Sequence, residues 1–154
     1  MLPSTKDRVP LHTDHEVNEQ IRRRTEANVA RCAREGPAAI EHRLDELDHE
    51  WDIERTLEAN AATAVLIGVT LGASVDRRFF ALPALVGGFL LQHAVQGWCP
   101  PVPIFRRLGF RTQNEIDHEK YALKALRGDF RTVAQKTRAD GKSDVAEAMQ
   151  AAEA

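Results

Sequence analysis

Two uncharged stretches dominate the pattern of polar and apolar positions along the chain. Residues 59–75 hold 17 positions without Asp, Glu, Lys or Arg, and residues 79–99 hold 21. As helices they would measure about 25 Å and 32 Å, close to the thickness of the hydrocarbon core of a bilayer. The three charges at 76–78 leave room for a tight turn between them. The pattern predicts a helical hairpin over 59–105 that spans a membrane.

The region before the hairpin, residues 13–58, is charged and has the pattern of two amphipathic helices. Thr13 and Glu16 match a capping box, and Gly36 followed by Pro37 is a stop signal. A second helix then begins, with one apolar stripe at helical spacing: Ile40, Leu44, Leu47 and Trp51. The stripe is thin, so we expect the helix to dock against another surface.

The region after the hairpin, residues 106–130, is basic and ends in a further helix. Thr112 and Glu115 match a second capping box, and Gly128 is placed to cap the end of that helix. We expect its basic side chains to meet anionic headgroups or the acidic helix before the hairpin: Arg106, Arg107, Arg111, Lys120, Lys124 and Arg127. The predicted fold class is all-α, a transmembrane hairpin flanked by cytoplasmic amphipathic helices.

The two ends of the chain show less pattern than the rest. Residues 1–12 contain two prolines and no periodicity, which predicts a flexible arm. Residues 131–154 are polar or rich in alanine, which predicts a weakly ordered tail.

The bulk composition conceals the contrast between these regions. With 154 residues, 29% of them charged, and a mean hydropathy of -0.40, the chain has the averages of a soluble globular protein. Yet 41 of its 44 charged side chains lie outside residues 59–105. A soluble helical bundle that buries both apolar helices remains an alternative. The flanking stripes offer little apolar surface to cover two such helices, so we favour the membrane.

Charge and motifs exclude several classes of function. The net charge is -2, which gives no global field that favours nucleic acid. Cys32 and Cys99 form neither a disulfide framework nor a zinc-ligand spacing, and no glycine-rich phosphate loop occurs. No signature of an enzyme is present either. We therefore expect no cofactor, no metal site and no catalytic activity.

Basic side chains near the helix ends predict the orientation of the hairpin. The turn carries Arg77 and Arg78. The side of the termini carries six: Arg43, Arg55, Arg106, Arg107, Arg111 and Lys120. Because cytoplasmic loops are enriched in Lys and Arg, both termini are predicted to lie in the cytoplasm, at a bacterial inner or plasma membrane.

Small and polar residues inside the two stretches are candidate contact positions. Small residues recur at intervals of four, which lets helix backbones approach closely: Ala64, Gly68, Gly72, Ala84 and Gly88. They can join the two helices of one hairpin or two protomers. The polar residues of the second stretch are candidates for function or for hydrogen bonds to Asn60, Thr63 or Thr70 of the first: Gln92, His93 and Gln96.

Cys99 is the candidate reactive thiol. It ends the second stretch, near Arg106 and Arg107, and cationic neighbours can activate a thiol. The alternative is a small apolar residue that packs at a helix end, where the negative end of the helix dipole disfavours a thiolate.

Four short segments follow one another through the hairpin: VLIGVTLG (65–72), FFALPALVG (79–87), QGWCP (96–100) and LG (108–109). In order and spacing they resemble the YgaP-like inner-membrane transmembrane domain, a two-helix hairpin family of largely unassigned function. The resemblance implies a membrane hairpin with cytoplasmic termini and leaves open a homodimer through its helices. Some relatives carry a rhodanese domain, but the segment around Cys32 does not match a rhodanese active-site loop, so sulfur transfer is not implied.

The sequence therefore predicts a small integral membrane protein that acts as a non-catalytic, membrane-anchored interaction or scaffold module. Its expected partners are the lipid bilayer and an unidentified protein, with no nucleic acid. One alternative function is a thiol-dependent accessory role in sulfur or redox traffic through Cys99.

Overall fold

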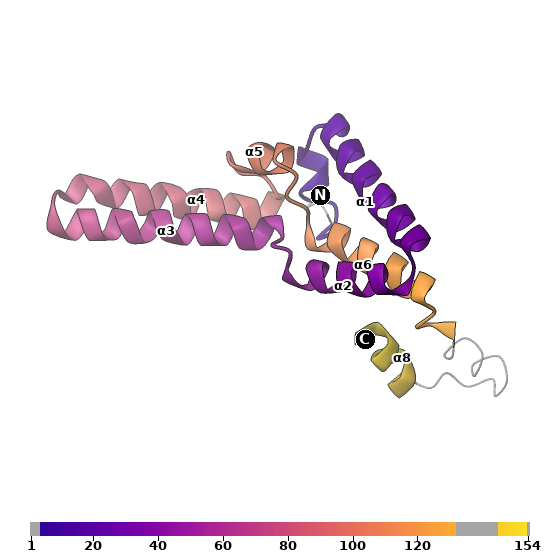
Figure 1. The fold of residues 1–154 in the computed structure, drawn as a ribbon. Coiled ribbons are helices and arrows are strands. Elements are labelled where there is room, and N and C mark those ends of the chain that lie inside the picture. The colour runs from indigo at the N-terminus through magenta and orange to yellow at the C-terminus, as the bar shows by residue number, and fades with distance from the viewer. Residues whose placement is uncertain (1–3, 132–144, 154) are drawn as a thin grey trace. The chain divides into compact units, whose positions relative to one another are not determined.

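The computed structural model describes residues 4–131 and 145–153, and all regular secondary structure within these ranges is helical (Figure 1). The predicted all-α class is confirmed. The long helices are α1 (His15–Glu35), α2 (Pro37–His49), α3 (Ile53–Ser74), α4 (Ala81–Gln96) and α6 (Gln113–Arg127). The short elements are η1 (Pro10–His12), η2 (Arg77–Phe80), α5 (Val102–Arg107) and α8 (Val145–Glu153).

Helices α3 and α4 lie side by side as an antiparallel pair joined by η2 (Figure 1). The Asp52 carboxylate caps the start of α3 by accepting a hydrogen bond from the backbone N–H of Arg55 at 2.8 Å. At the far end Asp76 caps η2 in the same way. The hairpin therefore begins at Ile53, six positions before the uncharged stretch, so that Glu54 and Glu58 belong to its first helix.

Glycines set how closely the two helices approach. A Cβ atom added at Gly68 would lie 2.5 Å from Cδ of Pro83, and one at Gly72 would lie 2.9 Å from the ring of Phe80. By contrast, a Cβ at Gly87 or Gly88 would meet nothing within 4 Å. Gly68 and Gly72 thus serve the contact within the hairpin, whereas Gly88 does not.

The chain divides into two compact units. The first comprises Met1–Arg23 and Trp51–Ile116 and therefore contains the hairpin and α5. Its core is a cluster against which Phe89, Phe105 and Phe110 pack: Val9, Ile53, Leu57, Cys99 and Val102. The ring of Phe105 meets that of Phe110 edge to face, with their centroids 5.5 Å apart.

The second unit comprises Arg24–Glu50 and Asp117–Ala154. Its buried apolar side chains include Cys32, Ile40, Leu44, Leu47 and Leu123. Ile40, Leu44 and Leu47 are three of the four residues of the predicted stripe. Glu119 is fully buried and accepts a hydrogen bond from Nε of Arg43 at 2.8 Å. Lys120 pairs with Asp48 at 2.5 Å, so this lysine meets the acidic helix, one of the two partners that its pattern predicted.

The two helices of the hairpin are long and apolar enough to cross a membrane, and their apolar side chains stay largely uncovered. In the most apolar 18-residue segment of Pro37–Ser74, 22% of the residues are buried. In the corresponding segment of Arg77–Gln96, 6% are buried. Leu66 and Leu91, one on each helix, are 68% and 67% exposed. The described residues therefore leave most of the apolar surface of both helices uncovered.

Several local predictions match the structure. Thr112 and Glu115 form the predicted capping box, with the backbone N–H of each bonded to the side chain of the other at 2.8 Å and 3.3 Å. Gly36 and Gly128 each follow the last residue of a helix and have a positive φ, of 95° and 97°, which glycine adopts readily. The stop signals placed at these two glycines are confirmed.

Other local predictions were wrong. The hydroxyl of Thr13 donates to the carbonyl of Val9 at 2.9 Å rather than capping a helix with Glu16. Trp51 does not continue the stripe, because α2 ends at His49 and the indole is 47% exposed. The indole instead stacks under the guanidinium of Arg55, whose Cζ lies 4.3 Å from the ring centroid.

The two ends of the chain also differ from their sequence patterns. The segment predicted to be a flexible arm contains η1, and Val9 within it is buried in the core of the first unit. Val145–Glu153, within the predicted weakly ordered tail, forms helix α8. The rest of that prediction, residues 132–144 and 154, lies outside the described residues.

Candidate functional site

A chain of three charged or polar side chains lies at the open end of the hairpin. Oε2 of Glu54, in the first turn of α3, lies 2.6 Å from Nε2 of His93, in the last turn of α4. Oε1 of the same carboxylate accepts a hydrogen bond from Arg8 at 2.9 Å. Arg8 also donates to the carbonyl of Ala94 at 3.1 Å. His93 is only 4% exposed, so its ring is fixed by these contacts.

The position of Arg8 depends on a glycine. Gly97 ends α4 with φ of 79°, and its N–H bonds the carbonyl of His93 at 2.7 Å. A Cβ atom at this position would collide with the backbone carbonyl of Arg8. Gly97 therefore lets the N-terminal segment cross the end of α4 and bring Arg8 to Glu54.

Cys99 places a thiol at the same end of the hairpin, three residues after α4 ends. Nε2 of the His93 ring is engaged by Glu54, and Nδ1 is buried without a partner that meets hydrogen-bond geometry. The thiol itself is 3% exposed and belongs to the core of the first unit. The thiol is therefore a buried core group, and no hydrogen bond joins it to the imidazole of His93 among the described contacts.

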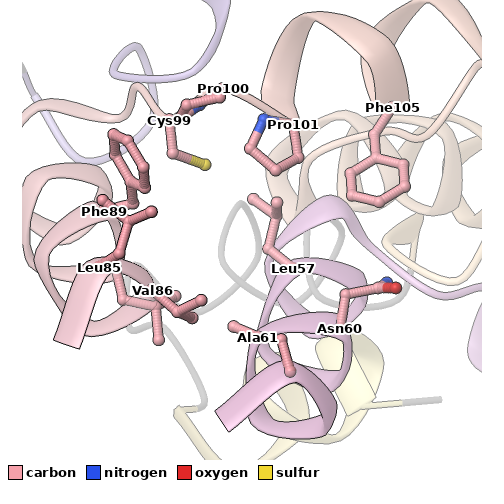
Figure 2. A pocket seen from close by; sticks show the side chains of 12 residues that line it. Leu57, Asn60, Ala61, Leu85, Val86, Phe89, Cys99, Pro100, Pro101 and Phe105 are labelled. Atoms are coloured by element: carbon pink, nitrogen blue, oxygen red, sulfur yellow. The ribbon is translucent and has the colours of Figure 1, made fainter. Parts of the chain in front are cut away.

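The thiol also faces a cavity, shown in Figure 2, of about 400 Å³ between α3 and α4. Leu57 and Ala61 line it from α3, and Leu85 and Phe89 from α4. Asn60 and Ala64 of α3 and Val86 and Leu90 of α4 also line it. The rest of the lining comes from the turn after α4 and from α5: Cys99, Pro100, Pro101 and Phe105. Apart from the thiol, Asn60 is the one polar side chain in this lining, so the cavity suits an apolar occupant.

A second polar cluster in the first unit holds α5 in place. Arg106 is fully buried, and its two terminal nitrogens bond both oxygens of Glu115, at 2.6 Å and 2.8 Å. Asn18 accepts a further hydrogen bond from the guanidinium at 2.8 Å. Burial acts to raise the pKa of Glu115, but the bonds and charge of Arg106, helped by Thr112, outweigh it and hold the pKa below its usual range. This cluster is a structural clamp around a guanidinium that is closed to solvent.

The structure separates the predicted polar residues of the second stretch. His93 is buried and bonded, whereas Gln92 is half-buried and Gln96 is exposed. The expected interhelical partners bond carbonyls of their own helix instead: Asn60 bonds Thr56, Thr63 bonds Ala59, and Thr70 bonds Leu66. His93 therefore reaches across the hairpin to an ionised side chain rather than to a hydroxyl or amide.

Sequence reasoning missed two of the four members of this site. Arg8 lies in the segment predicted to be a flexible arm, and Glu54 lies in the charged region 13–58, where the sequence pattern gives it no role of its own. A usable signal for Glu54 was its distance of five residues from the uncharged stretch. At that spacing Glu54 lies on the same helix as the first uncharged stretch. In an antiparallel hairpin it is then level with the end of the second uncharged stretch.

Among the residues that the structure describes, no group of three or more His, Cys, Asp or Glu side chains is arranged to hold a metal ion. Comparisons of the chain with protein-family models, with curated proteins and with solved structures give no match.

Proposed function

We propose that the protein is an integral membrane protein that spans the bilayer through α3 and α4 and acts as a membrane-anchored, non-catalytic interaction or scaffold module. The observation that carries this proposal is the exposure of apolar side chains along both helices. Core helices of a soluble protein are mostly buried, and so large an uncovered apolar surface marks a site of contact with lipid or protein. Lipid is the solvent that matches helices of this length.

The ends of the hairpin support a bilayer placement. Arg77 and Arg78 follow α3 at the turn, next to the exposed rings of Phe79 and Phe80. At the opposite end, α5 exposes Ile104, and Leu108 follows it at 68% exposure. Aromatic and apolar side chains at these two levels match the interfacial zones of a membrane.

Charge counts support cytoplasmic termini, although the structure changes the count. The Arg106 side chain is buried against Glu115, so it presents no charge to a membrane surface. Arg111 is buried as well. Without these two, four of the predicted residues remain in the segments that flank the hairpin in sequence, Arg43, Arg55, Arg107 and Lys120, against two in the turn. The proposed orientation at the inner membrane therefore keeps its basis.

The second unit supports the proposed scaffold role. The second unit offers a separate helical body with its own buried residues, and a cytoplasmic body tethered to a membrane is suited to hold a partner protein. The proposal includes membership of the YgaP-like hairpin family, on the motifs given above. It also includes a homodimer through the hairpin, for which Gly88 offers a surface that the chain itself leaves open.

Membrane retention after an alkaline carbonate wash tests the insertion. We expect the wild-type protein in the washed membrane pellet and its release by detergent. Leu66→Asp combined with Leu91→Asp should abolish retention, because each charge at a helix centre opposes insertion by about 2.5–3.5 kcal/mol. Leu126→Asp, at an exposed position of α6, is the matched control and should stay in the pellet. Recovery of the wild type in the washed supernatant would establish the soluble bundle instead.

The place of Cys99 on the wall of the cavity favours a second candidate function, a thiol-dependent accessory role in sulfur or redox traffic. If this role is the physiological one, a strain carrying Cys99→Ser should show the phenotype of a deletion strain. A wild-type phenotype would contradict it.

A further inference from the structure

We propose that α5 is an interfacial helix, which lies in the membrane–water interface and buries Ile104 and Leu108 among the acyl chains of the lipids around the hairpin. The inference rests on the proposed membrane insertion and deepens it, because it assigns a lipid contact to a helix outside the spanning pair. Both α5 and the hairpin lie in the first unit, so the proposal concerns that unit alone.

One face of α5 is fixed inside the first unit. Val102 and Arg106 lie one turn apart on this helix, and both are fully buried. Val102 belongs to the core cluster, and Arg106 is held by both oxygens of Glu115, at 2.6 Å and 2.8 Å. The helix cannot turn about its axis without breaking these contacts, so the direction of its opposite face is fixed as well.

The opposite face of α5 is apolar and uncovered. Ile104 is 61% exposed and Leu108 is 68% exposed. The N–H of Leu108 bonds the carbonyl of Ile104 at 3.0 Å, and Leu108 keeps helical backbone angles, so the two side chains stand one turn apart on the same face. A surface helix in water presents polar side chains on its outer face. The outer face of α5 has the composition that suits an apolar environment instead.

This outer face continues the uncovered surface of the hairpin. α5 packs on α3. Phe105 of α5, with Pro100 and Pro101 of the preceding turn, lines the same cavity as the side chains of α3 and α4 (Figure 2). No charged side chain belongs to that lining. The apolar surface of the hairpin therefore extends onto α5 without a charged boundary between them.

The small size of this face indicates what covers it. A stable protein interface buries about 800 Å² on each partner, and two aliphatic side chains on a six-residue helix offer far less. Acyl chains need no matching surface, and the burial of each apolar side chain among them is favourable. The adjoining helices are long and apolar enough to cross a bilayer, so the partner that reaches this face is the lipid around them.

The ion pair of Arg107 indicates that the contact is apolar rather than electrostatic. Arg107 directly precedes Leu108, and its guanidinium donates to Asp14 at 2.8 Å. Both side chains of the pair are exposed, and together they carry no net charge toward lipid headgroups. The immersion of Ile104 and Leu108 therefore depends on the burial of their surface, and it requires neither anionic lipid nor low salt.

Depth-dependent quenching of a fluorescent label tests the proposal. The full chain is reconstituted in phosphatidylcholine vesicles, with a label on a single introduced cysteine, Ile104→Cys or Leu108→Cys. Cys32 and Cys99 are buried and stay in place, and the wild type treated in parallel gives the background. The lipid carries a nitroxide near the top or near the end of its acyl chain, and iodide is the quencher in water. We expect the upper nitroxide to quench both positions more strongly than the lower one, and iodide to quench them weakly.

Two reference positions define the ends of the depth scale. Leu66→Cys, at an exposed position of α3, should be quenched most strongly by the lower nitroxide. Leu126→Cys, at an exposed position of α6, is the matched control that carries the same label outside the hairpin, and iodide alone should quench it. Equal lipid quenching at Leu126→Cys and Ile104→Cys would show that the label draws any exposed site into lipid, and would overturn the assignment to α5.

The position in α3 separates a failure of this proposal from a failure of membrane insertion. If lipid quenches Leu66→Cys while iodide quenches Ile104→Cys and Leu108→Cys, the hairpin is inserted and the proposal for α5 is wrong. Iodide quenching of Leu66→Cys would overturn both. Protection of Ile104→Cys from iodide and from both nitroxides would place a protein, such as a second copy of the chain, on this face and would contradict a lipid contact.

Lipid composition and salt test the apolar basis of the contact. Replacing part of the phosphatidylcholine by phosphatidylglycerol, or raising the salt concentration, should leave the quenching of Ile104→Cys unchanged. Lipid quenching that appears only with phosphatidylglycerol and is lost in high salt would show that charge holds α5 at the membrane, contrary to the proposal. Thermal unfolding of each labelled variant against the wild type identifies any that fails to fold, and the Leu108→Cys position gives a second, independent readout of the same face.

Discussion

The imidazole of His93 and the carboxylate of Glu54 face each other at 2.6 Å across the open end of the hairpin. They stand 39 positions apart in the sequence and close the pair of helices at the end opposite the turn. A hairpin held at one end by a short connection and at the other by a charged hydrogen bond has a fixed register between its helices. That register places Gly68 against Pro83 and brings Cys99 to the cavity.

Removal of this contact should destabilise the first unit. We expect Glu54→Ala to lower the free energy of unfolding by about 1.5–3 kcal/mol, because a hydrogen bond to a charged group is lost and His93 stays buried. Glu58→Ala, one turn further along the same helix and exposed, should change it by less than about 0.5 kcal/mol. Denaturant unfolding in detergent micelles measures both. Equal effects of the two variants would contradict the assigned role of Glu54.

The buried guanidinium of Arg106 should be more important for stability than its exposed neighbour. Arg106→Ala leaves Glu115 without its bidentate partner and should cost about 3–5 kcal/mol. Arg107→Ala removes an exposed pair with Asp14 and should cost at most about 1 kcal/mol. The same unfolding experiment compares the two variants, and a larger loss at Arg107 would refute the clamp.

Stability should fall in acid partly through Glu115. Its pKa lies below the usual value of about 4.3 in the folded protein, so it stabilises the fold at pH values above that of the unfolded chain. This contribution is lost as the pH falls through the pKa of the folded state. Unfolding free energies measured over a pH series should therefore decline less steeply in acid for Glu115→Gln than for the wild type. Glu58→Gln, at an exposed carboxylate of α3, is the control for the substitution itself.

Two glycines of the hairpin should respond differently to the same substitution. Gly68→Leu forces a side chain against Pro83 and should destabilise the hairpin by about 1–3 kcal/mol. Gly88→Leu has open space within the protomer and should leave its stability unchanged. If the proposed homodimer forms through this face, Gly88→Leu should reduce chemical cross-linking between protomers in the membrane. Cross-linking at the wild-type level would exclude Gly88 from any such contact.

The helices were predictable because their signals are local. The capping box of Thr112 and Glu115, and the stop signals at Gly36 and Gly128, act within a few residues, and all of them are present in the structure. The match at Thr13 failed because a tertiary contact of the preceding segment competes for it: Val9 is buried in the core, and its carbonyl binds the threonine hydroxyl. Local patterns cannot register such a contact.

The candidate site was only half predictable for the same reason. Cys99 and His93 stand out in the sequence because a thiol and an imidazole are rare in an apolar stretch. Their partners do not, since Glu54 is one acid among many and Arg8 lies in a segment without periodicity. What joins the four residues is the antiparallel packing of α3 and α4 and the crossing at Gly97, which spacing along the chain does not encode.

The central claim is that the hairpin crosses the membrane with its turn on the far side from both termini. Its most direct test is labelling of right-side-out membrane vesicles with a membrane-impermeant maleimide, after Cys32 and Cys99 are replaced by Ala. Single cysteines are then introduced as Val75→Cys in the turn and Met149→Cys in α8, both at exposed positions. We predict that Val75→Cys is labelled in sealed vesicles and Met149→Cys only after permeabilisation. A Val75→Cys variant that reacts only after permeabilisation would contradict the account.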